Sequence, residues 1–235
     1  MPEGHLLHRY AIAQRSPVGD VVAASSPQAV DGHVLESVEA HGKHLLHRFG
    51  IRWVHTHLGM QGVWAELPSP PPAPRRQARL RLSGTAATWD LFAPSVCELL
   101  DGHAVERLLG GLGPDPLRDD DPERTRTRLR SDDRAIGEAM LDQALFAGCG
   151  NVLRSEVLAA QRLDPRTPAS ALDDGTFAGV WHELSDRMRA AVRTGEIDKQ
   201  VYKRKECARC GAPVDAYDLP RGRTVYRCSA CLVAA

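Results

Sequence analysis

Two pairs of cysteines near the end of this 235-residue chain limit its fold more than any other feature. Two residues separate the members of each pair, Cys207 with Cys210 and Cys228 with Cys231, and 17 residues lie between the pairs. This spacing lets four sulfurs converge on one ion, and a closed all-thiolate shell is typical of structural Zn²⁺. Two disulfides or free thiols are the alternatives. We favour zinc because the sequence carries no secretion signal that would indicate an oxidising compartment.

The segment between the two pairs predicts a small hairpin. It contains Gly211, Pro213, the turn residues 220–222 and the alternating run 223–227, a pattern typical of a zinc ribbon. So small a hairpin buries little apolar surface, and the metal would supply about 10–16 kcal/mol of its folding free energy. We therefore expect one structural Zn²⁺, no catalytic metal and no organic cofactor, with the chemistry located elsewhere in the chain.

Composition predicts a globular protein with an uneven charge distribution. Hydrophobic residues make up 43% of the chain, and 30 basic residues balance 30 acidic ones. Residues 199–231 hold eight basic and three acidic residues, a net charge of +5. Such a charge is typical either of a solvated surface or of a face that binds nucleic-acid phosphates. No run of eighteen apolar residues is present, so we expect no membrane partner and a cytoplasmic location.

The first half of the chain favours strands. Short apolar–polar alternations separated by Gly and Pro predict strands over residues 43–49, 51–58, 79–82, 88–92 and 96–99. The proline-rich residues 68–74 predict an exposed, extended loop. Residues 112–117 and the acidic run 118–122 are typical of a linker between domains.

The second half favours helices. Ile136, Met140 and Ala144 form a helical stripe that ends near residues 148–150, and the apolar residues of 177–192 predict a longer helix. Asn151 opens another helix between them. Its side chain is expected to cap that helix, and the free N–H groups there would attract an anion such as phosphate. Capping alone is the alternative role.

Motifs spread along the chain resemble those of the formamidopyrimidine-DNA glycosylase/endonuclease VIII family of base-excision repair enzymes. They occur in order at residues 2–5, 42–46, 57–62, 112–117, 141–156 and 202–205, and in the zinc ribbon with residues 222–224. The resemblance implies an α+β fold: an N-terminal β-sandwich with flanking helices, then a helix–two-turn–helix domain with a C-terminal zinc ribbon. The domains would be residues 1–117, a linker 118–122, a helical domain 123–200 and a ribbon 201–235.

The resemblance also implies a bifunctional DNA glycosylase/AP lyase. If Met1 is removed, Pro2 becomes the N-terminal amine, with a reference pKa of about 7.7–8.0 that leaves it partly neutral near pH 7. A neutral amine can attack the sugar carbon of a damaged nucleotide, expel the base and form a Schiff base. This electron sink then permits β,δ-elimination of both phosphates. Taken alone, Pro2 would only permit removal of methionine.

Other site residues are carried over from the same resemblance. Glu3 would transfer protons to the opening sugar, and Lys43 and Arg223 would act in catalysis by contacting backbone phosphates. Asn151 would join Lys43 and Arg223 in gripping the DNA, and Met60 would fill the gap left by the extruded nucleotide. Judged in isolation, Met60 would be a core methionine.

Departures from the family pattern indicate its endonuclease VIII branch, which prefers oxidised pyrimidines. No Arg-Phe pair occurs near residues 92–95, and the stretch 194–206 is shorter than in members that cap 8-oxoguanine. Leu6 and Leu7 stand where a Glu commonly follows the Pro-Glu start. The alternatives are an oxidised-purine (formamidopyrimidine/8-oxoguanine) glycosylase of the same family or a zinc-ribbon DNA-binding protein without catalysis.

We further expect damaged DNA as the partner, a monomer, and a location in the bacterial cytosol or nucleoid. His55 and His57 share one strand face and could bind a metal together, but the sequence offers no third ligand nearby. We favour packing or proximity to DNA for this pair.

Overall fold

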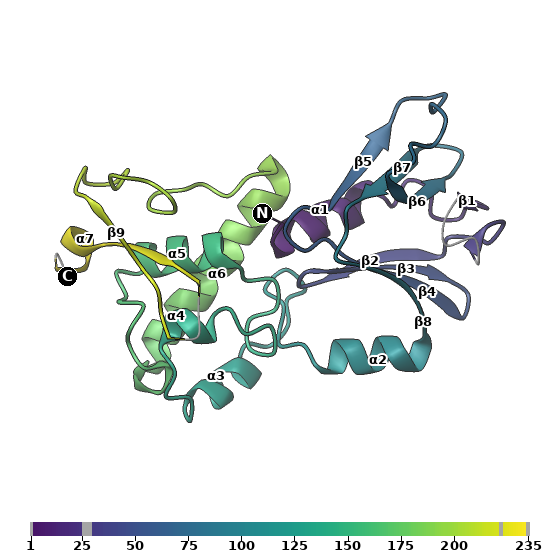
Figure 1. Ribbon diagram of the computed structural model, residues 1–235. Coiled ribbons are helices and arrows are strands. Elements are labelled where there is room, and N and C mark those ends of the chain that lie inside the picture. Colours follow the sequence, from purple (N-terminus) through teal and green to yellow (C-terminus); the bar gives the residue numbers. More distant parts are fainter. Residues whose placement is uncertain (1, 25–29, 221–222, 234–235) are drawn as a thin grey trace. The chain divides into compact units, whose positions relative to one another are not determined.

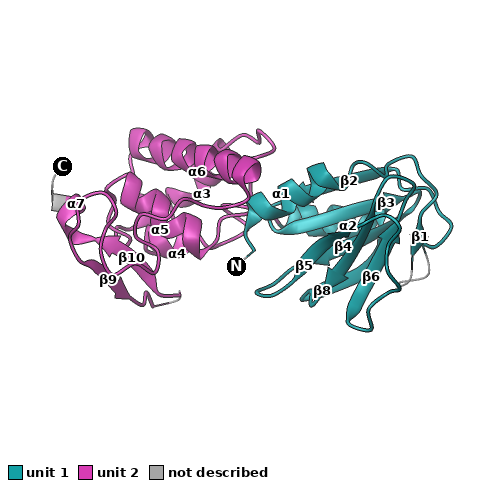
Figure 2. Ribbon diagram, turned by 90° about the horizontal axis from the view of Figure 1, so that it is seen from above, with its two compact units in different colours: residues 1–111 teal, residues 112–235 magenta. Residues whose placement is uncertain are grey.

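A computed structural model describes residues 2–24, 30–220 and 223–233 of the chain (Figure 1). The chain divides into two compact units, Met1–Gly111 and Leu112–Ala235 (Figure 2). The finer boundaries expected after residues 117, 122 and 200 remain predictions.

The first unit is a β-sandwich with helices at its flanks. Its elements are α1 (Gly4–Ala13), β1 (Ala23–Ala24), β2 (Ser37–His41), β3 (His44–Phe49), β4 (Arg52–His57), β5 (Val63–Leu67), β6 (Ala78–Ser83), β7 (Thr88–Phe92), β8 (Val96–Asp101) and α2 (Gly102–Gly110). One antiparallel sheet has the order β1-β6-β7-β5 and the other the order β2-β3-β4-β8. The predicted strands of the first half are therefore confirmed.

One buried core joins the two sheets. Leu45 and Val54 from one sheet pack in the same apolar cluster as Leu80 and Leu91 from the other. Side chains alternate along β4, so Val54 and Thr56 are buried toward this core while Trp53 and His57 are half-buried on the opposite face. Helix α1 contributes Leu7 to the core and contacts β2 and β3. The N-terminal residues are thereby anchored against the sheet.

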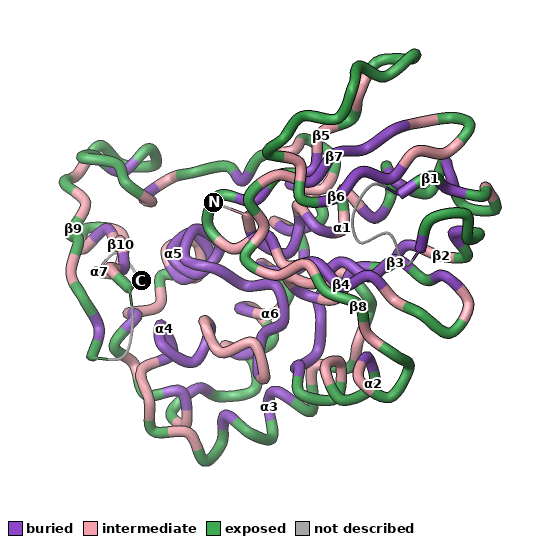
Figure 3. Tube along the Cα trace, turned by 45° about the vertical axis from the view of Figure 1, so that its right-hand side comes forward, coloured by how far each residue is buried: buried purple, intermediate pink, exposed green. Residues whose placement is uncertain are grey.

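The second unit is helical and ends in a two-stranded ribbon. Its elements are α3 (Glu123–Leu129), α4 (Ile136–Ala139), α5 (Asn151–Ala160), the 3-10 helix η2 (Ala169–Ala171), α6 (Asp174–Thr194), β9 (Val214–Tyr217), β10 (Val225–Cys228) and α7 (Ser229–Val233). Every residue from 151 to 158 in α5 is buried (Figure 3). The α+β class and the order of sandwich, helical part and ribbon agree with the expectation.

The helix predicted over residues 136–148 is wrong in extent. Helix α4 ends at Ala139, and the following residues form consecutive turns. Asp142 explains the break, because its Oδ1 accepts a hydrogen bond from the Ala144 N–H (3.0 Å) and its Oδ2 binds Arg134. A side chain that binds nearby backbone competes with the helix. Ile136 and Met140 are nevertheless buried, whereas Ala144 is half-buried in a turn.

The ribbon forms the hairpin that the sequence predicts. Strands β9 and β10 pair antiparallel, with Val225 opposite Tyr217 and Cys228 opposite Val214. The proline-rich residues 68–74 are exposed, as expected. Among the described residues, no helix combines the length and apolar character needed to cross a membrane.

Candidate functional site

The N-terminal pair lies at the start of α1. Glu3 occupies the N-cap position with an extended backbone, and its carbonyl accepts a hydrogen bond from the Leu6 N–H (3.0 Å). Its side chain is 0% exposed, whereas Pro2 is half-buried. Glu3 is therefore not an ordinary exposed carboxylate. A carboxyl group shielded from water in this way suits proton transfer at an adjacent reacting centre.

His5, three residues after Pro2, is neutral near pH 7. It is buried, and burial is the main cause that lowers its pKa to about 4. The imidazole therefore adds no positive charge beside Glu3 under working conditions.

Lys43 lies in the tight turn between β2 and β3, where His41 pairs with His44. The turn requires a positive φ, which Gly42 supplies at +56°. Lys43 is half-buried, and its charge contributes to lowering the pKa of the neighbouring His57, after burial as the main cause. The predicted cation thus lies at the end of a hairpin, close to several histidines.

These imidazoles form a connected group beside Lys43. His55 Nδ1 donates to Glu98 Oε1 (2.9 Å), and His55 Nε2 lies 2.8 Å from His44 Nδ1. His57 Nδ1 accepts from the Gly59 N–H (3.1 Å). Burial lowers the pKa of His44 to about 3. The sequence did not indicate that Glu98 is a partner of His55, because the two residues come together only when β4 and β8 pair.

Met60 is not a core residue. Its side chain is 59% exposed in the turn that follows β4. Gly59 has a φ of +63°, and a Cβ there would lie 2.8 Å from the Cβ of Ser95. The Gly62 N–H closes the turn on the Leu58 carbonyl (2.8 Å). The turn therefore presents an apolar side chain to solvent, as a wedge residue would require.

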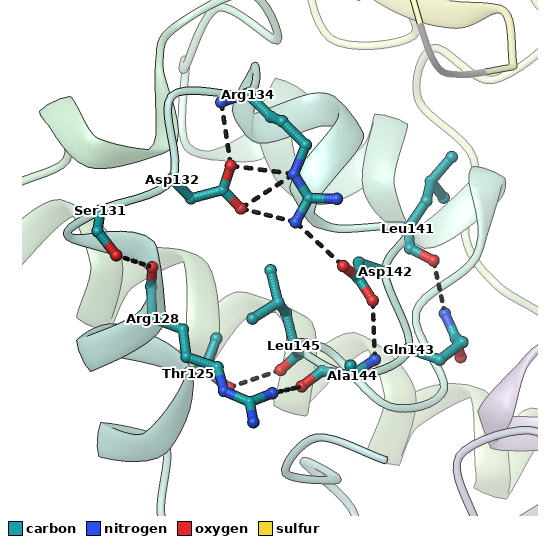
Figure 4. Close-up of polar contacts among 10 residues, drawn as sticks. All are labelled: Thr125, Arg128, Ser131, Asp132, Arg134, Leu141, Asp142, Gln143, Ala144 and Leu145. Atoms are coloured by element: carbon teal, nitrogen blue, oxygen red, sulfur yellow. Dashed lines mark hydrogen bonds and ion pairs between the residues drawn. The ribbon is translucent and has the colours of Figure 1, made fainter. Parts of the chain in front are cut away.

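In the second unit, a polar network holds the segment that precedes α5 (Figure 4). Arg134 bridges Asp132 (2.7 Å) and Asp142 (3.0 Å), and Thr125 Oγ1 donates to the Leu145 carbonyl (2.6 Å). Gln143, which Figure 4 shows bound to the Leu141 carbonyl, makes two further hydrogen bonds that the figure does not draw. Its Nε2 donates to the Cys149 carbonyl (2.9 Å), and its Oε1 accepts from the Gly148 N–H (3.0 Å). The segment that leads into α5 is thus fixed by side-chain hydrogen bonds.

The predicted capping role of Asn151 is wrong. Gly150 is the N-cap residue of α5, and no side chain there caps the helix. Asn151 is the first helical residue, and its Nδ2 donates to the carbonyl of Thr224 (3.1 Å). This carbonyl belongs to the residue after Arg223, whose side chain is exposed. Folding thus brings Asn151 and the ribbon segment of Arg223 together across 72 residues of sequence.

Arg154 and Glu156 were missed by the sequence analysis. Both are 0% exposed. Glu156 accepts hydrogen bonds from the N–H groups of Gln200 (2.7 Å), Val201 (3.1 Å) and Tyr202 (2.7 Å), and so fixes the chain that leads to the ribbon. Both residues lie in the motif 141–156, but nothing in the sequence shows that their charged side chains are buried.

The four predicted cysteines come together. One sulfur from each of Cys207, Cys210, Cys228 and Cys231 lies within 4.8 Å of the others. The separations of 3.9 Å (Cys207–Cys231), 3.5 Å (Cys210–Cys228) and 3.6 Å (Cys210–Cys231) approach the ~3.8 Å edge of a tetrahedron with Zn–S bonds of about 2.3 Å. The donor set and its geometry therefore fit a structural metal ion.

Comparisons with known proteins follow this division of the chain. Residues 3–91 match the formamidopyrimidine-DNA glycosylase N-terminal domain, and residues 112–203 match the formamidopyrimidine-DNA glycosylase H2TH domain. Endonuclease 8 1 of Mycobacterium tuberculosis is 36% identical over 98% of this chain and 99% of its own length. The DNA-(apurinic or apyrimidinic site) lyase Nei2 of Mycolicibacterium smegmatis is 30% identical over 100% of both chains.

Solved structures share the fold. Lactococcus lactis formamidopyrimidine DNA glycosylase, non-covalently bound to DNA with an AP site, superposes with a TM-score of 0.83 at 21% identity, over 97% of this chain and 98% of its own. MutM in complex with DNA containing carbocyclic 8-oxo-G gives a TM-score of 0.82 at 21% identity, over 98% and 99% of the two chains.

Proposed function

This chain belongs to the formamidopyrimidine-DNA glycosylase/endonuclease VIII family and is a DNA glycosylase/AP lyase of base-excision repair, and from this premise we propose that it removes oxidised pyrimidines through an N-terminal proline. The observation that carries the proposal is the placement of a wholly buried Glu3 directly after Pro2 at the start of α1. An amine and a sheltered acid are the two groups that the reaction needs, and here they are adjacent.

The reaction begins at the sugar. With Met1 removed, the neutral Pro2 nitrogen bonds to C1′ of the damaged nucleotide, and the bond from C1′ to the base breaks with its electron pair leaving on the base. The base takes up the proton that the Pro2 nitrogen loses. Glu3 donates a proton to the ring oxygen as the sugar opens, which leaves an iminium between Pro2 and C1′. Loss of a C2′ proton then expels the 3′ phosphate, and a second elimination expels the 5′ phosphate. Water finally releases Pro2.

The remaining residues bind and position the substrate. Lys43 contacts a phosphate beside the lesion, and Asn151 and Arg223 contact the backbone from the second unit. Met60 enters the stack from which the target nucleotide has rotated. Cys207, Cys210, Cys228 and Cys231 hold one Zn²⁺, which supplies folding free energy to the ribbon and takes no part in the chemistry. Damaged DNA is the partner, and we expect a monomer in the cytosol or nucleoid.

Two short connections support a preference for pyrimidines. Only residues 93–95 join β7 to β8, and this is where purine-preferring relatives are expected to carry the Arg-Phe pair. Residues 195–206 join α6 to the first ribbon cysteine, and Glu156 holds three of their N–H groups. Little chain is left there for a loop that covers 8-oxoguanine.

Borohydride trapping tests the proposed nucleophile. The protein should become covalently joined to DNA containing an abasic site or thymine glycol, and mass spectrometry should find Met1 removed. A variant with one extra residue retained before Pro2 keeps every side chain but loses the terminal secondary amine, so it should form no adduct. Normal strand cleavage by protein that fully retains Met1 would exclude the mechanism.

A second experiment tests the lesion preference. Matched oligonucleotides bearing thymine glycol, dihydrouracil, 8-oxoguanine opposite cytosine or an abasic site should be cleaved with the two pyrimidine lesions ahead of 8-oxoguanine. If 8-oxoguanine were the best substrate by far, the oxidised-purine alternative would hold. If the protein bound DNA without trapping or cleavage, a non-catalytic zinc-ribbon protein would hold.

A further inference from the structure

The guanidinium of Arg154 lies completely inside the second unit. Arg154 projects from the middle of α5, is 0% exposed, and is one of the largest fully buried side chains of the described residues. A buried charge is destabilising unless hydrogen bonds and polar groups compensate it. The groups that surround this guanidinium therefore indicate why the helix carries it.

Its hydrogen bonds connect three separate segments. Nη1 donates to the carbonyl of Gly137 (2.9 Å) in α4. Nη2 donates to the carbonyls of Arg223 (2.8 Å) and Thr224 (3.0 Å), which immediately precede β10, and to Oδ1 of Asn151. One planar side chain thus ties α4, the first turn of α5 and the ribbon to a common point.

The same bonds determine which way the Asn151 amide faces. Its Oδ1 accepts from Arg154, and its Nδ2 donates to the Thr224 carbonyl (3.1 Å). The flipped amide would set N–H groups against the guanidinium and an oxygen against a carbonyl, so only this orientation satisfies both neighbours. The second hydrogen of Nδ2 is then the donor that a phosphate contact requires.

We propose that Arg154 is a positioning residue that joins Asn151 and Arg223 into a single phosphate clamp. This inference rests on the proposed function, in which both residues contact the DNA backbone. Arg154 does not touch DNA itself. It orients the Asn151 amide, and it holds the backbone of Arg223 so that the exposed side chain starts from a fixed point.

The clamp also couples the ribbon to the helix. Arg154 binds carbonyls that lie four and five residues before Cys228. A well-ordered junction at Arg154 therefore stabilises the cysteine cluster, and a bound metal ion in turn stabilises the junction. Arg227 Nη1, bound to Asp164 (2.6 Å), adds a second tie between β10 and the rest of the unit. Loss of the Arg154 fork should therefore loosen the metal site even when no DNA is present.

Substitution by lysine separates charge from geometry. Arg154→Lys keeps the positive charge but offers one ammonium in place of the fork, so it cannot serve all four acceptors. Arg126→Lys is the matched control, because Arg126 is also nine-tenths buried in the same unit but pairs with Asp174 (2.7 Å), on another part of the chain. Both variants should bind zinc stoichiometrically and keep their helical circular dichroism.

Two measurements then test the proposal. In the absence of DNA, zinc release to a chelator should be at least about 5-fold faster for Arg154→Lys than for Arg126→Lys. Arg154→Lys should bind duplex DNA containing an abasic-site analogue roughly 10–100-fold more weakly than the wild type. The slope of log affinity against log salt concentration should become shallower by the amount that about one phosphate contact contributes. Asn151→Ala should weaken binding far less in the Arg154→Lys background than in the wild type, because the two residues act as one unit.

The outcomes distinguish this inference from the proposed function. If the wild type shows no preference for abasic DNA, the proposed function fails, and the chelation result still tests the junction. If the wild type binds but Arg154→Lys matches Arg126→Lys in zinc release, salt slope and response to Asn151→Ala, the inference is overturned. Should Arg154→Lys not fold, Asn151→Asp tests the same contact. It keeps an oxygen for Arg154 but loses the donor, so unchanged DNA affinity would contradict the proposal.

Discussion

Buried histidines make the first unit sensitive to acid. Burial lowers the pKa of His47 to about 4, and the side chain is 0% exposed. The unfolded chain, with a histidine pKa near 6.5, takes up a proton that folded His47 does not. The contribution of neutral His47 to the free energy of unfolding is therefore complete above pH 6.5 and is lost as the pH drops toward 4. At pH 5 this one group should lower the free energy of unfolding by on the order of 2 kcal/mol.

Urea unfolding at pH 7.5 and pH 5.0 measures this effect. His47→Gln can keep a hydrogen bond to Gln14, the present partner at 2.7 Å, but cannot titrate. It should reduce the loss of stability between the two pH values by on the order of 2 kcal/mol. His182→Gln is the control, because His182 is 78% exposed on α6. Equal losses in wild type and His47→Gln would contradict the prediction.

Glu3→Gln should separate base release from strand cleavage. Glutamine has nearly the size of Glu3 but cannot donate the proton that opens the sugar ring, so base excision should fall by at least about 100-fold. An abasic sugar is already partly ring-opened, and its cleavage should fall much less. Glu66→Gln, at an exposed position of β5, serves as the control. Equal losses on thymine glycol and abasic DNA would show that Glu3 has another role.

Met60→Ala should reduce excision without reducing stability. The side chain is 59% exposed, so truncation should change the free energy of unfolding by less than about 0.5 kcal/mol. As a wedge, it should matter in duplex DNA, where extrusion of a nucleotide leaves a gap, and little in single strands. Ile51→Ala removes an apolar side chain that is 86% exposed at a different turn. It should change excision neither from duplex nor from single-stranded DNA. Excision rates of the wild type and both variants are measured side by side on duplex and on single-stranded DNA containing thymine glycol.

Among the secondary-structure elements, the ribbon should depend most on the proposed Zn²⁺. A hairpin of two four-residue strands is too small to be stable alone, so a bound ion would provide most of its folding free energy. Cys210→Ser should lower the zinc content below one per chain and weaken binding to abasic DNA by at least about 10-fold. Cys149→Ser, which changes a buried cysteine outside the metal cluster, should retain zinc. Elemental analysis and binding titrations decide between these results.

The elements that sequence patterns predicted are those whose signal is local. Alternation placed β3, β4, β6, β7 and β8 to within about two residues, whereas β1, β2 and β5 were not identified. The helix expected to 148 failed because Asp142 and Gln143 bind backbone groups that a helix would otherwise use. Asn151 was predicted to cap α5, but its Nδ2 donates instead to the carbonyl of Thr224, a distant partner that no local pattern indicates. Arg154 and Glu156 were missed because only tertiary packing turns an ordinary charged residue into a buried anchor.

On the scale of the whole molecule, the two units have separate cores. One apolar cluster contains residues of 7–91 and another contains residues of 129–197. Residues 112–235 should therefore fold alone, bind one zinc ion and retain salt-sensitive DNA binding, because that part carries the ribbon and the Asn151 site. It should form no borohydride adduct, since it lacks Pro2. A 112–235 fragment that remains unfolded with zinc present would contradict this independence.

One thiolate of the metal cluster, that of Cys210, is exposed to solvent. Peroxide and related oxidants damage DNA bases, and they also attack accessible sulfur. Oxidation of this ligand would release the ion, and the junction at Arg154 would transmit that loss to the grip on the phosphates. The stress that creates the lesions would, when severe enough, switch off the protein that removes them.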